Sequence, residues 1–361
     1  MKRFVIQLLV LVLGFAQSFA QTGFAPSGPN AEVIIGTGKQ PTIGVSQAGE
    51  IKITYGAGNV IYYVTSKDQG QTFSKPTTVA TLPKLNLGMG CGPQIAATKD
   101  FTLITATTRA GDIYACSLPA DQTAWQKPVK INDADTVAKE GFVAVTAGTG
   151  NNVFAVWLDM RGNNQNKIYG ARSINGGRTW QPNQLIYQSP DTTVCQCCKP
   201  AVTTDAKGNV YVQFRNWIHG SRDLHLVSSG NQGRSFGPAQ KLGAGTWSLK
   251  GCPMDGGDLA VATDGTVTTV WRREQNIYLA KPGQPEVLIG MGKTPTLAET
   301  PAGPAIAWQY QGEIVFRGPK SAERINLGKG SFPQLTLLPY AKTAVCVFER
   351  DGQVVVKRLV I

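Results

Sequence analysis

The sequence offers few residues of the types that build common catalytic centres. Among its 361 residues there are only two histidines, His219 and His225. His225 alternates with apolar residues in the stretch LHLVSS, which favours a packed side chain in a strand. We find no Ser–His–Asp arrangement, no phosphate-binding loop and no dinucleotide-binding fingerprint. These absences argue against triad hydrolases and nucleotide-dependent enzymes.

Long hydrophobic runs are absent except at the N-terminus. Lys2 and Arg3 precede an apolar run, residues 4–16, that is too short to span a bilayer. Small residues then occupy the positions expected of a cleavage site before Gln21, so we predict a signal peptide over 1–20. No cysteine follows that site, which argues against a lipoprotein anchor. We expect an exported protein, periplasmic or secreted, with no membrane insertion and with disulfides permitted.

Acidic residues are scarce relative to basic ones. The chain has 23 Asp and Glu against 35 Lys and Arg, a formal net charge of +12. The basic residues are scattered rather than clustered, so we do not expect a nucleic acid partner. A basic exported protein favours anionic partners, and an anionic glycan or small anionic ligand is the partner we expect.

A repeated pair of strands joined by a tight turn organises the whole chain. We count seven copies, and they read IKITYGAGNVIYYVTS, TLITATTRAGDIYACS, VFAVWLDMRGNNQNKIYGARS, VYVQFRNWIHGSRDLHLVSS, VTTVWRREQNIYLAKPG, AIAWQYQGEIVFRG and AVCVFERDGQVVVKRL. A short strand entered through Pro or Gly precedes most copies, as in QPTIGVS and FPQLTLL, and a fourth strand usually follows. Four strands per repeat are typical of a β-propeller blade. We predict one all-β propeller domain over 21–361 with seven blades, six being the alternative.

The last repeat has no fourth strand of its own. The stretch AEVIIGTG, which starts at Ala31, precedes the first repeat and has the composition of a strand. Pairing this N-terminal segment with the last blade would close the ring and remove an exposed sheet edge. We therefore predict closure by an N-terminal strand.

Three loops that follow the third strand of a repeat share the pattern S-x-D/N-x-G-x-T/S-F/W. The Asp or Asn can bond to backbone groups two or more residues on, glycine supplies a positive φ, and the aromatic residue packs between strands. We expect these loops to be structural turn clamps. Their key residues are Ser66, Asp68, Gly70 and Phe73, then Ser173, Asn175, Gly177 and Trp180, and then Ser229, Asn231, Gly233 and Phe236.

The three loops resemble Asp-boxes, the bacterial-neuraminidase (BNR) repeats of the sialidase superfamily. The resemblance implies a sialidase-like propeller. Sialidases also carry an arginine triad, a Tyr/Glu pair and an Asp acid, and their first arginine usually lies in an F/Y-R-I-P motif. No such motif is present, and the matching region QPTIGVSQAGEIKITY contains no arginine. Whether the chain acts as an exo-α-sialidase or another glycoside hydrolase is left open.

Strand connectivity assigns residues to the face opposite the Asp-box loops, which we call the top face. Arginines recur there at the ends of second strands, and their planar guanidinium groups suit carboxylate, sulfate or phosphate. An equally open alternative is that they form ion pairs between blades with Asp159, Asp223 and Glu274. The predicted ligand-binding residues are Arg109, Arg161, Arg215, Trp217, His219, Arg222 and Arg272. Asp159 or Asp255 would act as the acid if a glycoside is hydrolysed.

Five of the seven cysteines also fall on the top face, at Cys91, Cys195, Cys197, Cys198 and Cys252. A disulfide between Cys252 and a cysteine of the 195–198 loop would tie two neighbouring loops. Alternatively, the thiolates bind Cu or Zn, or act as redox or nucleophilic groups. We predict that Cys116 and Cys346, which lie inside strands, are buried thiols.

The cysteine segments carry a second resemblance. CQCCKPAV and GCPMDGGDLA are similar to motifs of a group of exported bacterial sialidase-like propellers. This resemblance implies that the cysteines and the WIHGSRD turn form one site. We expect a monomer that recognises, and in one version hydrolyses, an anionic glycan on its top face. A Cu/Zn or redox site protein and a non-catalytic protein-binding scaffold are the alternatives.

Overall fold

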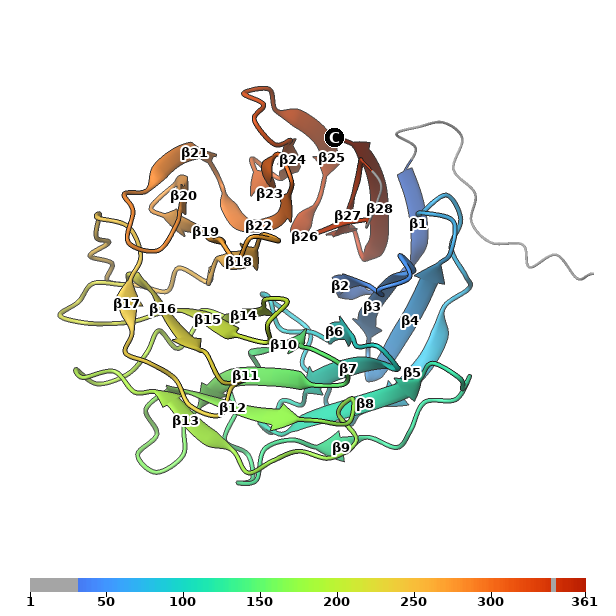
Figure 1. Ribbon diagram of the computed structural model, residues 1–361, viewed down its shortest axis with the longest axis horizontal. Helices are drawn as coiled ribbons and strands as arrows, with labels where there is room; N and C mark the ends of the chain where they lie inside the picture. The colour runs from blue at the N-terminus through green and yellow to red at the C-terminus, as the bar shows by residue number, and fades with distance from the viewer. Residues whose placement is uncertain (1–31, 339–341) are drawn as a thin grey trace, which may run out of the picture.

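The computed structural model describes residues 32–338 and 342–361, and within them the chain is built from 28 strands and no helix. The strands form seven antiparallel sheets of four strands each, arranged as a ring (Figure 1). The prediction of an all-β propeller with seven blades is confirmed. No helix able to cross a bilayer occurs among the described residues. The predicted signal peptide, residues 1–20, lies outside them.

Each of the first six blades uses four strands in chain order from the centre of the ring outward. Blade one has β2 (Lys39–Val45), β3 (Ile51–Ala57), β4 (Val60–Ser66) and β5 (Thr77–Thr81), and blade two has β6 (Gln94–Ala97), β7 (Phe101–Thr107), β8 (Ile113–Pro119) and β9 (Val129–Lys130). Blade three has β10 (Val143–Ala147), β11 (Val153–Asp159), β12 (Lys167–Ser173) and β13 (Gln184–Tyr187), and blade four has β14 (Ala201–Thr204), β15 (Val210–Arg215), β16 (Leu224–Ser229) and β17 (Gln240–Lys241). Blade five has β18 (Asp258–Val261), β19 (Val267–Arg273), β20 (Asn276–Ala280) and β21 (Val287–Met291), and blade six has β22 (Lys293–Thr300), β23 (Gly303–Tyr310), β24 (Glu313–Arg317) and β25 (Ile325–Lys329).

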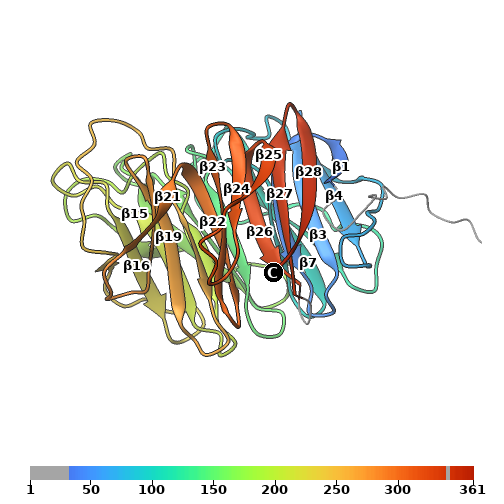
Figure 2. The ribbon, with the colours of Figure 1, turned by 90° about the horizontal axis from the view of Figure 1, so that it is seen from above.

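Blade seven combines both ends of the described chain. Its strands are β26 (Ser331–Leu337), β27 (Thr343–Arg350), β28 (Gln353–Val360) and β1 (Glu32–Thr37), in the order β1-β28-β27-β26. The N-terminal strand β1 pairs antiparallel with β28, and the side chains of Arg350 and Glu32 form an ion pair beside this junction. Figures 1 and 2 show the blue β1 beside the red β28. The predicted ring closure by an N-terminal strand is confirmed.

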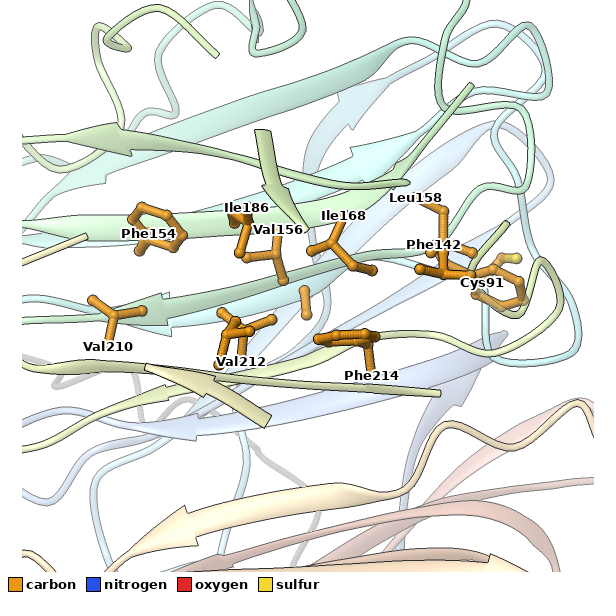
Figure 3. Close-up of a cluster of buried hydrophobic side chains, with 13 residues drawn as sticks. Cys91, Phe142, Phe154, Val156, Leu158, Ile168, Ile186, Val210, Val212 and Phe214 are labelled. Carbon is orange, nitrogen blue, oxygen red and sulfur yellow. The ribbon is translucent and has the colours of Figure 1, made fainter. Parts of the chain in front are cut away.

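The hydrophobic core lies between blades as a series of layers. The layer between blades three and four contains Phe154 and Val156 of β11 and Val212 and Phe214 of β15 (Figure 3). All seven residues of β11 are buried, because neighbouring blades cover both faces of a central strand. Burial of such side chains is the main favourable term that holds one blade against the next.

The three loops with the pattern S-x-D/N-x-G-x-T/S-F/W make the same hydrogen bonds. In the first, Ser66 Oγ donates to Asp68 Oδ1 at 2.8 Å and accepts from Gly70 N at 2.8 Å, while Asp68 Oδ1 accepts from Thr72 N at 2.9 Å. The same serine–glycine and Asx–backbone bonds recur in the loops 173–180 and 229–236. Gly70 has φ +79°, a conformation that suits glycine. Phe73 is fully buried at the end of its turn.

Candidate functional site on the top face

Two loops meet on the top face between blades four and five. The first leads into β14 and carries the cysteines 195–198, and the second leads into β18 and carries Cys252. A disulfide joins Cys197 to Cys252, with their Cα atoms 6.1 Å apart. Gly256 allows the close approach, since a Cβ at that position would collide with the carbonyl oxygen of Lys199. The predicted bridge between Cys252 and the blade-four loop is confirmed.

Cys195 and Cys198 remain as free thiols beside this disulfide. Both are buried, and their Sγ atoms lie 3.1 Å apart. The Sγ of Cys195 also lies 3.7 Å from the Sγ of Cys197 and accepts a hydrogen bond of 3.1 Å from Arg222 Nη1. Three sulfurs of this loop, those of 195, 197 and 198, lie within 4.8 Å of one another.

The two free thiols have opposite pKa shifts. The hydrogen bond between the two thiols lowers the pKa of Cys195 to about 6, and the positive charges of Arg215 and Arg222 act in the same direction against the effect of burial. Burial, together with the neighbouring Cys195, raises the pKa of Cys198 well above its usual value. The surroundings therefore favour the thiolate form at Cys195 and the thiol form at Cys198.

The remaining cysteines lie apart from this cluster. Cys91 is buried against blade three and its thiol donates to the carbonyl of Glu140 at 3.4 Å. Its assignment to the same metal or disulfide site does not fit, because the sulfur cluster comprises only residues of the 195–198 and 252–254 segments. Cys116 and Cys346 are buried as predicted, and burial raises the pKa of each to about 12.

Arg215 serves the fold rather than a ligand. Its guanidinium is buried and donates to three backbone carbonyls, those of Asp255 at 3.0 Å, Arg222 at 2.6 Å and Arg272 at 2.8 Å. The ring of Trp247 covers it at 5.2 Å. These three bonds use a donor on each of its nitrogens, so the arrangement does not favour its predicted role in gripping an anion. The same bonds join blade four to blade five.

Arg222 and Arg161 are also occupied. Arg222 is buried, donates to Leu249 O and to the Cys195 sulfur, and stacks on Trp217 at 4.4 Å. Arg161 pairs with Asp159 and with Asp133, both at 2.8 Å. The alternative predicted ion pairs between blades, but Asp159 belongs to the same blade as Arg161, and only the pair with Asp133, which follows β9, joins two blades. Neither guanidinium is free for a ligand, so their predicted ligand-binding roles do not fit the structure either.

Both proposed acids are sequestered. Asp159 has no exposed surface and accepts hydrogen bonds from Trp157 Nε1 and from Arg161. Asp255 is buried and accepts from the backbone N–H groups of Gly257 and Thr294 at 3.2 and 2.7 Å. A general acid must reach the leaving group of its substrate. Burial of both carboxyl groups does not favour the prediction that either acts as an acid, although Asp255 lines a small cavity on the top face.

The other predicted ligand-binding residues retain surface. Arg109 and His219 are exposed in the turns that follow β7 and β15, and His219 adopts φ 49° with its N–H donating to Asp191 at 2.8 Å. Trp217 is half-buried, and Arg222 lies over its ring. Arg272 is half-buried and donates to Glu274 O at 2.5 Å and Pro253 O at 3.4 Å. Of the predicted arginines, Arg272 borders an open groove.

This groove lies between blades five and six and encloses about 270 Å³. Arg272 and Lys293 supply positive charge, Tyr310 supplies an aromatic ring with a hydroxyl group, and Gln275 and Gln309 supply amides. Lys293 was missed in the sequence, although it is the first residue of the inner strand β22. The rule that loops leading into inner strands face the top would have identified it.

A second, smaller cavity of about 80 Å³ lies at the mouth of the central channel. Lys199 reaches into its wall and donates to Gln94 Oε1 at 3.0 Å, and burial lowers the pKa of Lys199. The volume is small beside the several hundred Å³ usual for ligand pockets. The groove is therefore the better candidate for a sugar-sized ligand.

No known family model matches the sequence, and no curated protein does. Solved structures share the fold at low identity. The lectin BP39L from Burkholderia pseudomallei has a TM-score of 0.66 at 10% identity over 90% of this chain and 96% of its own. An ulvan lyase of polysaccharide lyase family PL25 has a TM-score of 0.57 at 10% identity over 95% of this chain and 96% of its own.

A sialidase is also among the similar structures. The Trypanosoma rangeli sialidase has a TM-score of 0.50 at 12% identity, over 94% of this chain and 58% of its own. The chain is thus a β-propeller of sialidase-like fold, similar in architecture to a lectin, a lyase and a sialidase. At these identities the likeness shows the fold alone.

Proposed function

We propose that the protein binds an anionic glycan in the groove between blades five and six. The observation that carries the proposal is the pairing of two cationic side chains, Arg272 and Lys293, with the ring of Tyr310 and flanking amides in one open groove. Cations bind carboxylate or sulfate groups, while aromatic rings and amides contact the sugar. The similar structures support a saccharide ligand, since one is a lectin and another was solved bound to a GlcA–Rha3S saccharide.

Binding without hydrolysis is the form of the proposal that the geometry favours. Glycoside hydrolases of the common kind need two carboxyl groups that flank the scissile bond. Asp159 and Asp255 are buried and fully hydrogen-bonded, and no carboxyl group lines the groove. The protein would act as an exported protein, which the N-terminal sequence and the disulfide between Cys197 and Cys252 support.

Calorimetric titration with matched pairs of saccharides tests the proposal. The probes are a GlcA–Rha3S oligosaccharide with its desulfated form, and sialyllactose with lactose. We expect the charged member of a pair to bind more tightly, and Lys293→Ala to weaken it about tenfold, the effect of one charged hydrogen bond. Added salt should weaken binding as well.

Lys281→Ala is the matched control. Lys281 is exposed in the neighbouring blade five, directly after β20, on the face opposite the groove. The substitution Lys281→Ala removes one positive charge, as Lys293→Ala does, but leaves the groove unchanged. Equal losses in Lys281→Ala and Lys293→Ala, or no preference for the charged saccharides, would overturn the proposal.

A further inference from the structure

The sulfur cluster places a buried dithiol against a disulfide that reaches the surface. Cys195 and Cys198 are at most 1% exposed, whereas Cys252 is exposed. The Sγ of Cys195 lies 3.1 Å from that of Cys198 and 3.7 Å from that of Cys197, which is bonded to Cys252. The four sulfurs therefore form one contiguous cluster that reaches the top face at Cys252.

The surroundings favour thiolate chemistry at one end of the pair. The guanidinium of Arg222 donates directly to Cys195 Sγ, and Arg215 lies close enough to add its charge. A thiolate is the nucleophile in thiol–disulfide exchange, and nearby cations stabilise it. Cys195 thus sits as a nucleophile beside a sulfur that it can attack, with Cys198 behind it to complete the exchange.

The same surroundings disfavour a metal cation. Two guanidinium groups bring positive charge to the place where a cation would bind, and one of them already donates to the Cys195 sulfur. Cys197, the third possible thiolate, is used in the disulfide. Of the clustered cysteines, only Cys195 and Cys198 are then left as thiol ligands.

We propose that Cys195, Cys198, Cys197 and Cys252 form a dithiol–disulfide relay that carries two electrons between the interior and the top face. The Cys195 thiolate attacks Cys197 Sγ, so that a bond between 195 and 197 forms and Cys252 leaves as a thiolate. Cys198 then attacks Cys195 Sγ, so that a bond between 195 and 198 forms and Cys197 leaves as a thiolate. The proton of Cys198 passes to one of the two released sulfurs.

This exchange conserves atoms, charge and electrons, because one disulfide and one dithiol are present before and after it. The buried pair becomes oxidised and the pair 197/252 becomes reduced. The Cys252 thiolate then attacks an external disulfide, so that a mixed disulfide forms and one external thiolate leaves. Cys197 attacks Cys252 Sγ in this mixed disulfide, so that the 197–252 disulfide forms again and the second external thiolate leaves. The substrate class is thus a small-molecule or protein disulfide that meets the top face at Cys252.

The test uses the folded, full-length exported protein with its Cys197–Cys252 disulfide intact, and the probe is 5,5′-dithiobis(2-nitrobenzoic acid). The described free thiols are all buried, so a direct reaction should be slow. The relay predicts release of two equivalents of the coloured thiol, with mass spectrometry then finding a 195–198 disulfide. Cys252→Ala leaves the buried dithiol in place and should slow the release at least tenfold.

Two further variants keep the test decisive. Cys195→Ser should slow the release of the coloured thiol to the same extent as Cys252→Ala. Arg222→Gln should also slow this release, because it removes the charge beside Cys195 while leaving every sulfur in place. Cys91→Ala is the matched control, because it removes a buried thiol outside the cluster and should leave the release unchanged. Thermal unfolding shows whether each variant is folded.

Three results would overturn the relay. The first is an unchanged rate in Cys252→Ala, which would mean that the buried thiols react directly. The second is no release from the folded wild-type protein. The third is stoichiometric copper or zinc in the isolated protein that leaves when the thiols are modified, which would make the cluster a metal site. None of these outcomes bears on glycan binding at Arg272 and Lys293.

Discussion

Arg222 donates a hydrogen bond of 3.1 Å to the sulfur of Cys195, and the same arginine stacks on Trp217 at 4.4 Å. The WIHGSRD turn and the cysteine loop are therefore joined in one structure by a single side chain. The stacking fixes the guanidinium plane, since the ring covers one of its faces. The hydrogen bond then directs its charge at one of the two free thiols and leaves Cys198 without such a donor.

Arg222→Gln should raise the pKa of Cys195 from about 6 toward its usual value of 9.0. The variant keeps a hydrogen-bond donor but removes the charge. Thiolate absorbance followed over a pH titration measures the shift. A titration curve that does not move would contradict the assignment of the charge effect to Arg222.

The stability of the folded protein should depend on pH through the same group. Because the folded-state pKa of Cys195 lies below its usual value, the thiolate stabilises the fold. This contribution is fully present above pH 9 and is lost as the pH falls to about 6, with a slope of at most about 1.4 kcal/mol per pH unit. Urea unfolding of wild type and Cys195→Ala at several pH values isolates the contribution of the thiolate to the free energy of unfolding. Parallel pH profiles for the two proteins would mean that the thiolate makes no such contribution.

Cys252→Ala should lower the free energy of unfolding by about 2–4 kcal/mol, since the disulfide closes a loop between residues 55 positions apart. Chemical denaturation with and without a reducing agent checks this value. The reducing agent should destabilise the wild type and have little effect on the variant. Equal effects on both proteins would mean that another bond is being reduced.

Asp68→Ala should destabilise the protein by about 1–2 kcal/mol, because the carboxylate accepts hydrogen bonds from Gln71 N and Thr72 N and from the Ser66 hydroxyl. Burial alone would raise the pKa of Asp68, but these bonds outweigh it and lower the pKa. The stabilisation is therefore present at neutral pH and is lost as the pH falls through the lowered pKa. Thermal unfolding measures the loss. Lys67→Ala, in the same loop but exposed, should have no effect.

Ile35→Ala in β1 should cost about 2–5 kcal/mol, because Ile35 has no exposed surface and packs in the layer that closes the ring. Ile34→Ala changes the neighbouring residue of the same strand, which is 38% exposed, and should cost far less. Urea unfolding compares the two variants. Equal losses would mean that β1 is not held by its buried face.

The repeated strands were predictable because their signals are local. Each central hairpin shows two apolar runs around a tight turn, and Pro or Gly marks the start of many inner strands. The pairing of β1 with β28 was also predictable. The last repeat has no fourth strand of its own, and the N-terminal segment has the composition of a strand, so pairing the two removes an exposed sheet edge. The bridge to Cys252 followed from the same topology, which places the loops of adjacent blades side by side.

The contacts and burial of the arginine side chains could not be predicted in this way. Connectivity places Arg215, Arg222 and Arg272 on one face, but it does not show where their guanidinium groups point. Packing of the loops 252–257 and 245–249 presents carbonyl groups to the first two, which buries them, while Arg272 keeps its place beside an open groove. The groove itself depends on the spacing between blades five and six, for which no local sequence signal exists.

The sequence by itself therefore determined the number of blades, the closure of the ring and the face on which the cysteines gather, because strand periodicity and chain connectivity are properties of the chain. Only the tertiary structure decided which cysteine bonds to Cys252, which thiol receives the charge of Arg222, and which carboxyl groups are sealed from solvent. Those outcomes depend on distances of a few ångströms between loops far apart in the chain, and such distances are set by how the blades pack.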